Sequence, residues 1–313
     1  MGKGIRIFFV TDVHGSNLCY RKFLNALKVY NVDVGILLGD LTGKMLIPLV
    51  EKPGVGWQTT FMGHQLEITT QEELGKLKKT IEMVGYYWAN LTMEEFTEYK
   101  ATPKMLDELF NRLMLERLKG WISLADERLA GTSYKVYMAP GNDDHMEVDK
   151  VIEDSAAIVN CNNRCVMVGD HEMVTFAWTN PTPWDTPREK PDEELEPMLE
   201  KLLANVQNKA NAIFNFHAPP YGFALDLAPE LTKDLIQAAD RKIHVGSRSV
   251  AKMIQKYQPL LGLHGHIHES RGVQKIGRTT IINPGSEYSE GILKGVVIML
   301  EKGKVQDYVF TNG

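Results

Sequence analysis

Short apolar runs divide the chain, and each ends in a loop that carries aspartate, asparagine or histidine. Several runs are apolar at nearly every position, which is typical of strands buried on both faces of a sheet. Apolar residues at helical spacing follow the first run and predict a helix over residues 18–28. Five runs have this form: Ile5 to Val10, Val34 to Leu38, Val136 to Ala139, Ala212 to Phe216 and Leu260 to Leu263.

The second half of the chain is richer in predicted strands than the first. Short strands without helices between them are expected over residues 157–159, 164–168 and 173–178. Helices are expected over residues 193–206 and 250–257, and terminal strands over residues 279–282 and 296–300. Strand–helix units followed by a strand-rich half predict a sandwich of two sheets with helices outside.

Residues 44–130 are interpreted as an insertion, because Asp40 and Asn142 lie much further apart than the about 30 residues of a strand–helix–strand unit. The core then comprises residues 1–43 and 131–313. The insertion is expected to be mainly helical, with capping boxes at Thr70 and Thr92, a helix from Thr102-Pro103 onwards and a few short strands. It could be a cap over an active site, a dimerisation element or a layer packed on the core.

Composition and charge exclude several classes of function. The 313 residues carry a net charge of -5, which argues against a groove for long nucleic acid. No apolar stretch approaches the roughly 18 residues that span a bilayer, and the first strand begins too early for a signal peptide. The three cysteines, Cys19, Cys161 and Cys165, form no Cys-x-x-Cys pattern. We therefore expect a cytoplasmic protein with reduced thiols and no membrane partner.

The loops after the five apolar runs share one chemistry. Functional groups in an open α/β sheet gather at the carboxyl ends of its strands, so these loops are expected to meet. Carboxylates and imidazoles without a thiolate suit borderline divalent metal ions. The loops supply enough groups for two ions: Asp12-Val13-His14, Gly39-Asp40, Gly141-Asn142, Phe216-His217 and Gly265-His266-Ile267-His268.

In their order along the chain, these motifs resemble those of the calcineurin-like metallophosphoesterase superfamily. Gly141-Asn142-x-Asp144 and Asn283-Pro284-Gly285-Ser286 extend the resemblance, which runs from residue 5 to about residue 300 and leaves out the insertion. The resemblance implies an α/β fold, a four-layer αββα sandwich of two mixed β-sheets flanked by helices. It also implies a hydrolase for phosphoesters, either diesters or monoesters, with a small or nucleotide-like substrate.

The resemblance further implies a dinuclear metal centre, in which a hydroxide that bridges the two metals attacks phosphorus. Manganese is the favoured ion, with iron, zinc, cobalt or nickel as alternatives. Seven side chains would hold the two ions: Asp12, His14 and His268 for the first, Asn142, His217 and His266 for the second, and Asp40 as the bridge between them.

One position departs from the family pattern. Many members carry a histidine directly after the asparagine, where it is thought to protonate the leaving group, and this chain has Asp143 there. Asp143 could serve as the acid only with a raised pKa, and His145 is the alternative donor. Asp144 resembles the family carboxylate that orients a histidine, here His14. Good leaving groups, as in aryl esters or phosphodiesters, would suit this change.

Other residues and functions stay open at this point. Arg188 or Arg248 could bind a substrate phosphate, Tyr221 could line the pocket, and His264 is expected to pack rather than bind metal. One alternative hypothesis is that the protein has the same fold but is a catalytically idle protein-binding scaffold. Another is that it is a nuclease. The expected partner is a small phosphoester, with a homo-oligomer formed through the insertion as a further possibility.

Overall fold

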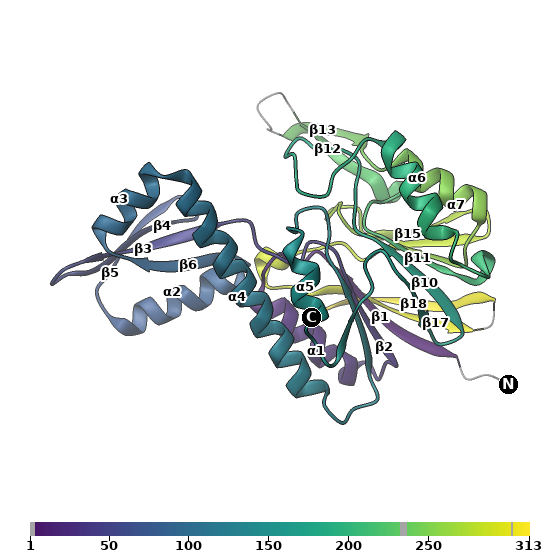
Figure 1. Cartoon of the computed structure of the whole chain (residues 1–313), viewed down its shortest axis with the longest axis horizontal. Coiled ribbons are helices and arrows are strands. Elements are labelled where there is room, and N and C mark those ends of the chain that lie inside the picture. Colours follow the sequence, from purple (N-terminus) through teal and green to yellow (C-terminus); the bar gives the residue numbers. More distant parts are fainter. Residues whose placement is uncertain (1–3, 232–236, 302) are drawn as a thin grey trace.

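Two six-stranded mixed sheets face each other in the computed structural model, which describes residues 4–231, 237–301 and 303–313 (Figure 1). The first sheet has the order β18-β17-β1-β2-β7-β8. Its inner strands pair in parallel, and β17 and β18 join them antiparallel. The strands are β1 (Ile5–Thr11), β2 (Val34–Leu38), β7 (Lys135–Ala139), β8 (Ile158–Asn160), β17 (Lys294–Glu301) and β18 (Lys304–Asn312).

The second sheet has the order β15-β16-β14-β11-β10-β9 and is also parallel in its middle and antiparallel at its edges. Its strands are β9 (Cys165–Val168), β10 (His171–Phe176), β11 (Ile213–Phe216), β14 (Leu261–Leu263), β15 (Gly272–Ile276) and β16 (Thr279–Asn283). A separate hairpin pairs β12 (Leu227–Leu231) with β13 (Gln237–His244).

The side chains of β1 show how the layers are built. Ile7 and Phe9 are buried between the two sheets, whereas Phe8 and Val10 are buried under helices on the outer face. This alternation follows from the two-residue period of a strand, and burial on both faces explains why the run is apolar throughout. Helices α1 (Asn17–Val29), α4 (Pro103–Leu129) and α5 (Glu147–Glu153) cover the first sheet, and α6 (Asp192–Leu203) and α7 (Arg248–Tyr257) cover the second. The expected αββα sandwich is confirmed.

Residues 44–130 build a third sheet, which projects from the sandwich at the left of Figure 1. Its order is β5-β4-β3-β6, and it has an apolar core of its own around Leu49 and Ile81. The expected capping boxes are present at Thr70 and Thr92. The elements are β3 (Leu46–Lys52), β4 (Gly56–Phe61), β5 (His64–Ile68), α2 (Gln71–Met83), β6 (Tyr87–Leu91), α3 (Met93–Ala101) and the start of α4, which runs back along the sandwich.

Three glycines join this third sheet to the loops that follow β1 and β2. Gly85, just before β6, has a φ of +87°, and a Cβ atom there would lie 1.9 Å from the carbonyl oxygen of His14. A Cβ atom on Gly43 would lie 1.9 Å from the carbonyl oxygen of Gly85, and one on Gly15 would lie 2.5 Å from it. The backbones touch directly here, and only glycine permits this approach.

Gly85→Ala is therefore expected to lower the thermal unfolding midpoint. The left-handed backbone alone costs an alanine about 1–2 kcal/mol, and the clash with His14 adds to it. Gly75→Ala is the matched control, because Gly75 lies in α2 with no atom within 4 Å of its added methyl group. That change is expected to stabilise the helix by about 1 kcal/mol. Equal midpoints for the two variants would contradict the proposed contact.

Candidate metal centre

The loops after β1 and β14 bring Asp12, His14 and His268 together, with one candidate ligand atom of each within 4.8 Å of the others. The Nε2 atoms of His14 and His268 are 3.1 Å apart, and His268 Nε2 lies 3.7 Å from Asp12 Oδ1. The separation of the two nitrogens is less than twice the usual metal–nitrogen bond of about 2.1 Å, so one ion could touch both.

A second group forms beside the first from Asp40, His217 and His266. Nε2 of His217 lies 3.4 Å from Asp40 Oδ1 and 3.1 Å from the amide oxygen of Asn142. The amide nitrogen of Asn142 donates to Thr186 Oγ1 at 2.8 Å, which turns the amide oxygen towards the centre. This group therefore offers a carboxylate, an amide oxygen and two imidazoles.

Asp40 lies between the two groups. Its Oδ1 faces His217, and its Oδ2 lies 3.7 Å from Nε2 of His14. The backbone N–H of Asp143 also donates to Oδ1 at 3.0 Å. With one oxygen towards each group, the carboxylate could be shared between them.

Four of the seven expected ligands have left-handed backbones, with φ of 54° at Asp12, 39° at His14, 40° at Asp40 and 66° at His266. Side chains other than glycine rarely adopt such φ values, and residues held in them cluster at functional sites. The strain is retained where the surrounding structure fixes the loop, as the contact between Gly85 and His14 does here.

Charges in the centre are strongly coupled. Burial alone would raise the pKa of Asp12, but the charge of His217 and a hydrogen bond from His268 outweigh it and lower that pKa to about 2. Burial opposes protonation of His217, yet the carboxylates of Asp40 and Asp12 raise its pKa to about 9. Buried carboxylates that attract a proton to a neighbouring histidine would also attract divalent cations, whose binding displaces that proton.

The expectation that Asp144 orients His14 is wrong. Its carboxylate does not contact His14 but accepts hydrogen bonds from the backbone N–H of Leu41, Thr42 and Gly141 and from the hydroxyl of Thr42, at 2.6–2.9 Å. It joins the loop that carries Asp40 to the loop that carries Asn142. Its carboxylate is fully buried, so it acts by positioning the loops that carry the ligands.

The expectation that Arg188 could bind a substrate phosphate is also wrong, because its side chain is only 2% exposed and is bound to protein groups. Its guanidinium donates to the carbonyl oxygens of Asp144 and His145 and pairs with Asp149, all at 2.8 Å. These contacts fix the loop after β7. Arg248 lies over the ring of Tyr221 at 3.9 Å, and neither residue lines the cleft beside the metal centre.

His264 packs as expected. Its Nδ1 donates to the carbonyl oxygens of Phe216 at 2.9 Å and Ala218 at 3.1 Å, which ties the end of β14 to the end of β11. Burial lowers its pKa to about 4, so the ring is neutral near pH 7.

Asp143 lies at the edge of the centre, with its Oδ2 3.7 Å from Nδ1 of His14. Burial and the charge of Asp40 raise its pKa to about 7, although the ion pair with Lys44 opposes this shift. Lys44 was not predicted from the sequence, where its only distinction is that it follows the Gly39-Asp40 loop. His145 lies further out and lines the adjoining cleft.

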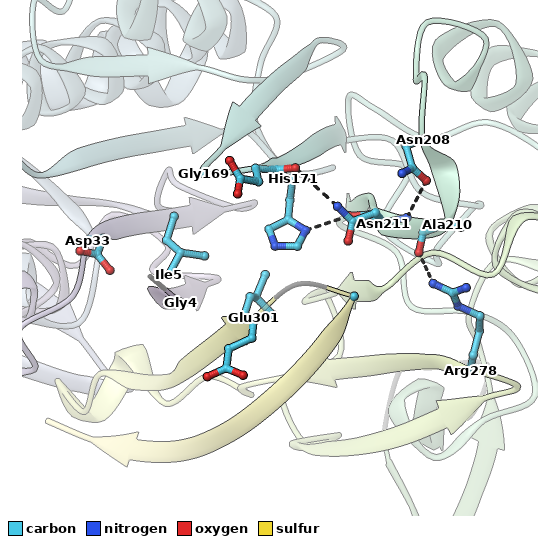
Figure 2. Close-up of a pocket in the computed structure, with 13 residues that line it drawn as sticks. Gly4, Ile5, Asp33, Gly169, His171, Asn208, Ala210, Asn211, Arg278 and Glu301 are labelled. Atoms are coloured by element: carbon cyan, nitrogen blue, oxygen red, sulfur yellow. Dashed lines mark hydrogen bonds between the residues drawn. The ribbon is translucent and has the colours of Figure 1, made fainter. Parts of the chain in front are cut away.

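The metal centre does not lie at the largest cavity described here. A cavity of about 670 Å³ opens between Ile5, at the start of β1, and Arg278, with His171 pointing towards it (Figure 2). The ligand Asp12 follows the far end of β1, about 20 Å away at the rise of a strand. None of the groups of potential metal ligands among the described residues lies at this cavity. We therefore assign function to the smaller cleft of about 320 Å³ beside Asp143.

Comparison with known proteins agrees with this centre. A model of the family described as calcineurin-like phosphoesterase matches residues 5–270. The chain belongs to the calcineurin-like phosphoesterase family. Membership of this family supports hydrolysis of a phosphoester with divalent metal ions, and the donor set of the centre fits such ions.

The individual proteins that this family member resembles have low sequence identity to it. The uncharacterized protein MJ1162 of Methanocaldococcus jannaschii is 35% identical over 162 residues, which cover 50% of this chain and 68% of that protein. The crystal structure of TT1561 of Thermus thermophilus is similar over 99% of both chains, with a TM-score of 0.53 and 14% identity. Another solved structure reaches a TM-score of 0.59, also at 14% identity and 99% coverage of both chains. At these identities the solved structures show a shared fold alone.

Within the described part of this calcineurin-like phosphoesterase, none of the helices has the length and apolar character needed to cross a membrane.

Metal binding is expected to be measurable without any substrate. Manganese should bind at two ions per chain and raise the thermal unfolding midpoint, because a ligand at 100 times its Kd stabilises a folded protein by about 2.7 kcal/mol. Asp40→Asn should weaken binding of both ions, since this carboxylate lies between the two groups. Asp170→Asn, an exposed change at the other end of the sandwich, is the control. Calorimetry and metal analysis that found no bound ion in the wild type would contradict the assignment.

Proposed function

We propose that this protein is a dinuclear metal-dependent phosphoesterase that hydrolyses a small or nucleotide-like phosphoester. The observation that carries the proposal is the convergence of ligand side chains from separate strand ends, four of them on left-handed backbones. Family membership supports the same chemistry. Among the candidate ions manganese is our first choice, because three of the seven ligands are carboxylate or amide oxygens, which suit this ion.

The ligand groups divide between two ions in this proposal. Asp12, His14 and His268 serve the first ion, Asn142, His217 and His266 serve the second, and Asp40 serves both. When bound, the two ions supply charge stabilisation at the phosphoryl oxygens and a water nucleophile that is activated at neutral pH. The protein's part is to keep these side chains in place, which Asp144 and Arg188 do by fixing the two central loops.

Asp143 is our candidate for the residue that protonates the leaving group. It takes the position after Asn142, and it lines the cleft beside the metal centre. Lys44 lies beside Asp143 and keeps a positive charge at the same place, which would attract a phosphoryl oxygen when Asp143 is protonated. His145 lines the same cleft and is the alternative donor.

We also propose that the protein acts in the cytoplasm. Cys19, Cys161 and Cys165 are all free, and Cys19 and Cys161 are buried, so none is paired as extracellular cysteines commonly are.

Wild-type protein supplied with manganese is expected to hydrolyse 4-nitrophenyl phosphate or its diester. Asp40→Asn should reduce kcat/KM by more than about a hundredfold, since even groups outside the ligand shell of a metal cost 10–100-fold when changed. The exposed control Asp170→Asn should retain activity. Wild-type protein that stayed inert with manganese, iron, cobalt and zinc would refute the proposed function.

Asp143→Asn tests the proton donor through its dependence on the leaving group. With phenyl phosphate, whose leaving group needs a proton, the kcat of the variant should fall about 10²–10⁴-fold, which is the usual contribution of a general acid. The loss should be much smaller for 4-nitrophenyl phosphate, because its leaving group, 4-nitrophenolate, departs as a stable anion without a proton. His145→Gln is the matched comparison and should affect both esters alike. Equal losses for the two esters in Asp143→Asn would exclude Asp143, and a selective loss in His145→Gln would assign the role to His145.

A further inference from the structure

The cleft of about 320 Å³ beside the metal centre has walls from four separate parts of the chain. Lys44 and Asp143 lie at its metal end. Phe110 and Met114 come from α4, within residues 44–130, and Trp184 and Thr186 come from the loop between β10 and α6. The volume lies at the lower end of the range for small-molecule sites. The segment 44–130 therefore contributes side chains to the cleft in which the substrate would bind.

Phe110 forms a rigid aromatic wall in this cleft. Its ring meets the ring of Tyr87 edge to face, with centroids 5.3 Å apart and planes at 88°. Tyr87 is buried, and its hydroxyl accepts a hydrogen bond from the backbone N–H of Gly43 at 2.8 Å. Gly43 lies in the same loop as Asp40, so Tyr87 connects the ring of Phe110 to the loop that carries the central carboxylate.

Arg117 strengthens this attachment from α4. Its Nη1 donates to the carbonyl oxygens of Gly15 at 3.0 Å and Tyr86 at 2.7 Å. Its guanidinium also lies 4.4 Å from the centre of the Tyr87 ring. The helix is thereby joined to the loop after β1 as well as to the loop after β2, and the position of Phe110 is set relative to both.

Trp184 is the second aromatic group of the cleft, and it is 61% exposed. Small-molecule sites are lined mainly by hydrophobic and aromatic side chains with a few polar groups, and Trp184 with Phe110 gives this cleft such a lining. The charged groups of Lys44 and Asp143 line the same cleft at its metal end. The cleft thus combines a charged end beside the metal centre with flat aromatic side chains, which suits a phosphoester with an aromatic substituent.

A second hollow of about 640 Å³ adjoins the cleft and shares Lys44, Phe110 and His145 with it. Leu106 continues the same face of α4, since residues four apart lie above one another on a helix. The two hollows form a groove along α4 that leads away from the metal centre. A substituent larger than one ring would extend along this groove.

We propose that the cleft between α4 and Trp184 receives the leaving group of the substrate and selects phosphoesters that carry a flat aromatic ring, either an aryl group or a nucleobase. This inference rests on the proposed phosphoesterase function and adds the substrate class to it. Phe110 and Trp184 supply the stacking surfaces, and Lys44 attracts the phosphoryl group to the metal end.

Binding of phosphonates tests the cleft without catalysis, because their P–C bond is not hydrolysed. Calorimetry on the manganese-loaded wild type is expected to show tighter binding of phenylphosphonate than of methylphosphonate. Trp184→Ala and Phe110→Ala should each weaken phenylphosphonate binding about 5- to 150-fold, the range for one stacked ring, and leave methylphosphonate binding unchanged. Trp184→Phe should restore most of the preference. Tyr308→Ala, which removes an exposed ring from β18, is the matched control and should change neither ligand.

The values of kcat/KM for methyl phosphate, phenyl phosphate and adenosine 5′-phosphate show whether the preferred ring is an aryl group or a nucleobase. A selective loss of kcat/KM for adenosine 5′-phosphate in Trp184→Ala identifies a nucleobase, and one for phenyl phosphate identifies an aryl group. Equal binding of the two phosphonates by the wild type would overturn the inference, as would equal losses for both phosphonates in the alanine variants, even if hydrolysis were established. Failure of the wild type to hydrolyse any ester would instead refute the proposed function, while the phosphonate titrations would still report on the cleft.

Discussion

The metal centre depends on how the loops after β2 and β7 are held together, and the buried carboxylate of Asp144 does this. Each of its oxygens accepts hydrogen bonds, from Leu41 and Gly141 to one and from Thr42 to the other, so the carboxylate is satisfied from both loops at once. A buried charge is tolerated only with such partners. Because Asp40 and Asn142 lie on these two loops, their separation is fixed before any ion binds.

The segment 44–130 adds a second constraint on the same loops. Gly85 packs against the backbone of His14, and Tyr87 bonds to Gly43, so the third sheet touches the loops after both β1 and β2. The left-handed backbones of His14 and Asp40 are thereby supported from outside the sandwich. The segment is consequently both a support for the ligands and, through Phe110, a wall of the adjoining cleft.

Much of this could be predicted from the sequence, because the relevant patterns are local. Apolar runs predicted the strands that precede each ligand, and Thr70 and Thr92 with glutamate three residues later predicted the helix starts. The contacts of Lys44, Arg117 and Arg188 could not be predicted, because their partners lie far away in the chain and no motif surrounds them. Asp144 was found by its motif, but its partners are backbone groups, which a sequence pattern does not identify.

In the mechanism that we propose, two neighbouring cations are held by seven side chains from separate strand ends. Anomalous diffraction at the manganese absorption edge, from crystals grown with manganese, tests it most directly. Two peaks about 3.5–4 Å apart are expected, one beside Asp12 and His268 and the other beside His217 and Asn142, with Asp40 between them. The absence of anomalous density among these side chains, or manganese bound only elsewhere on the protein, would contradict it.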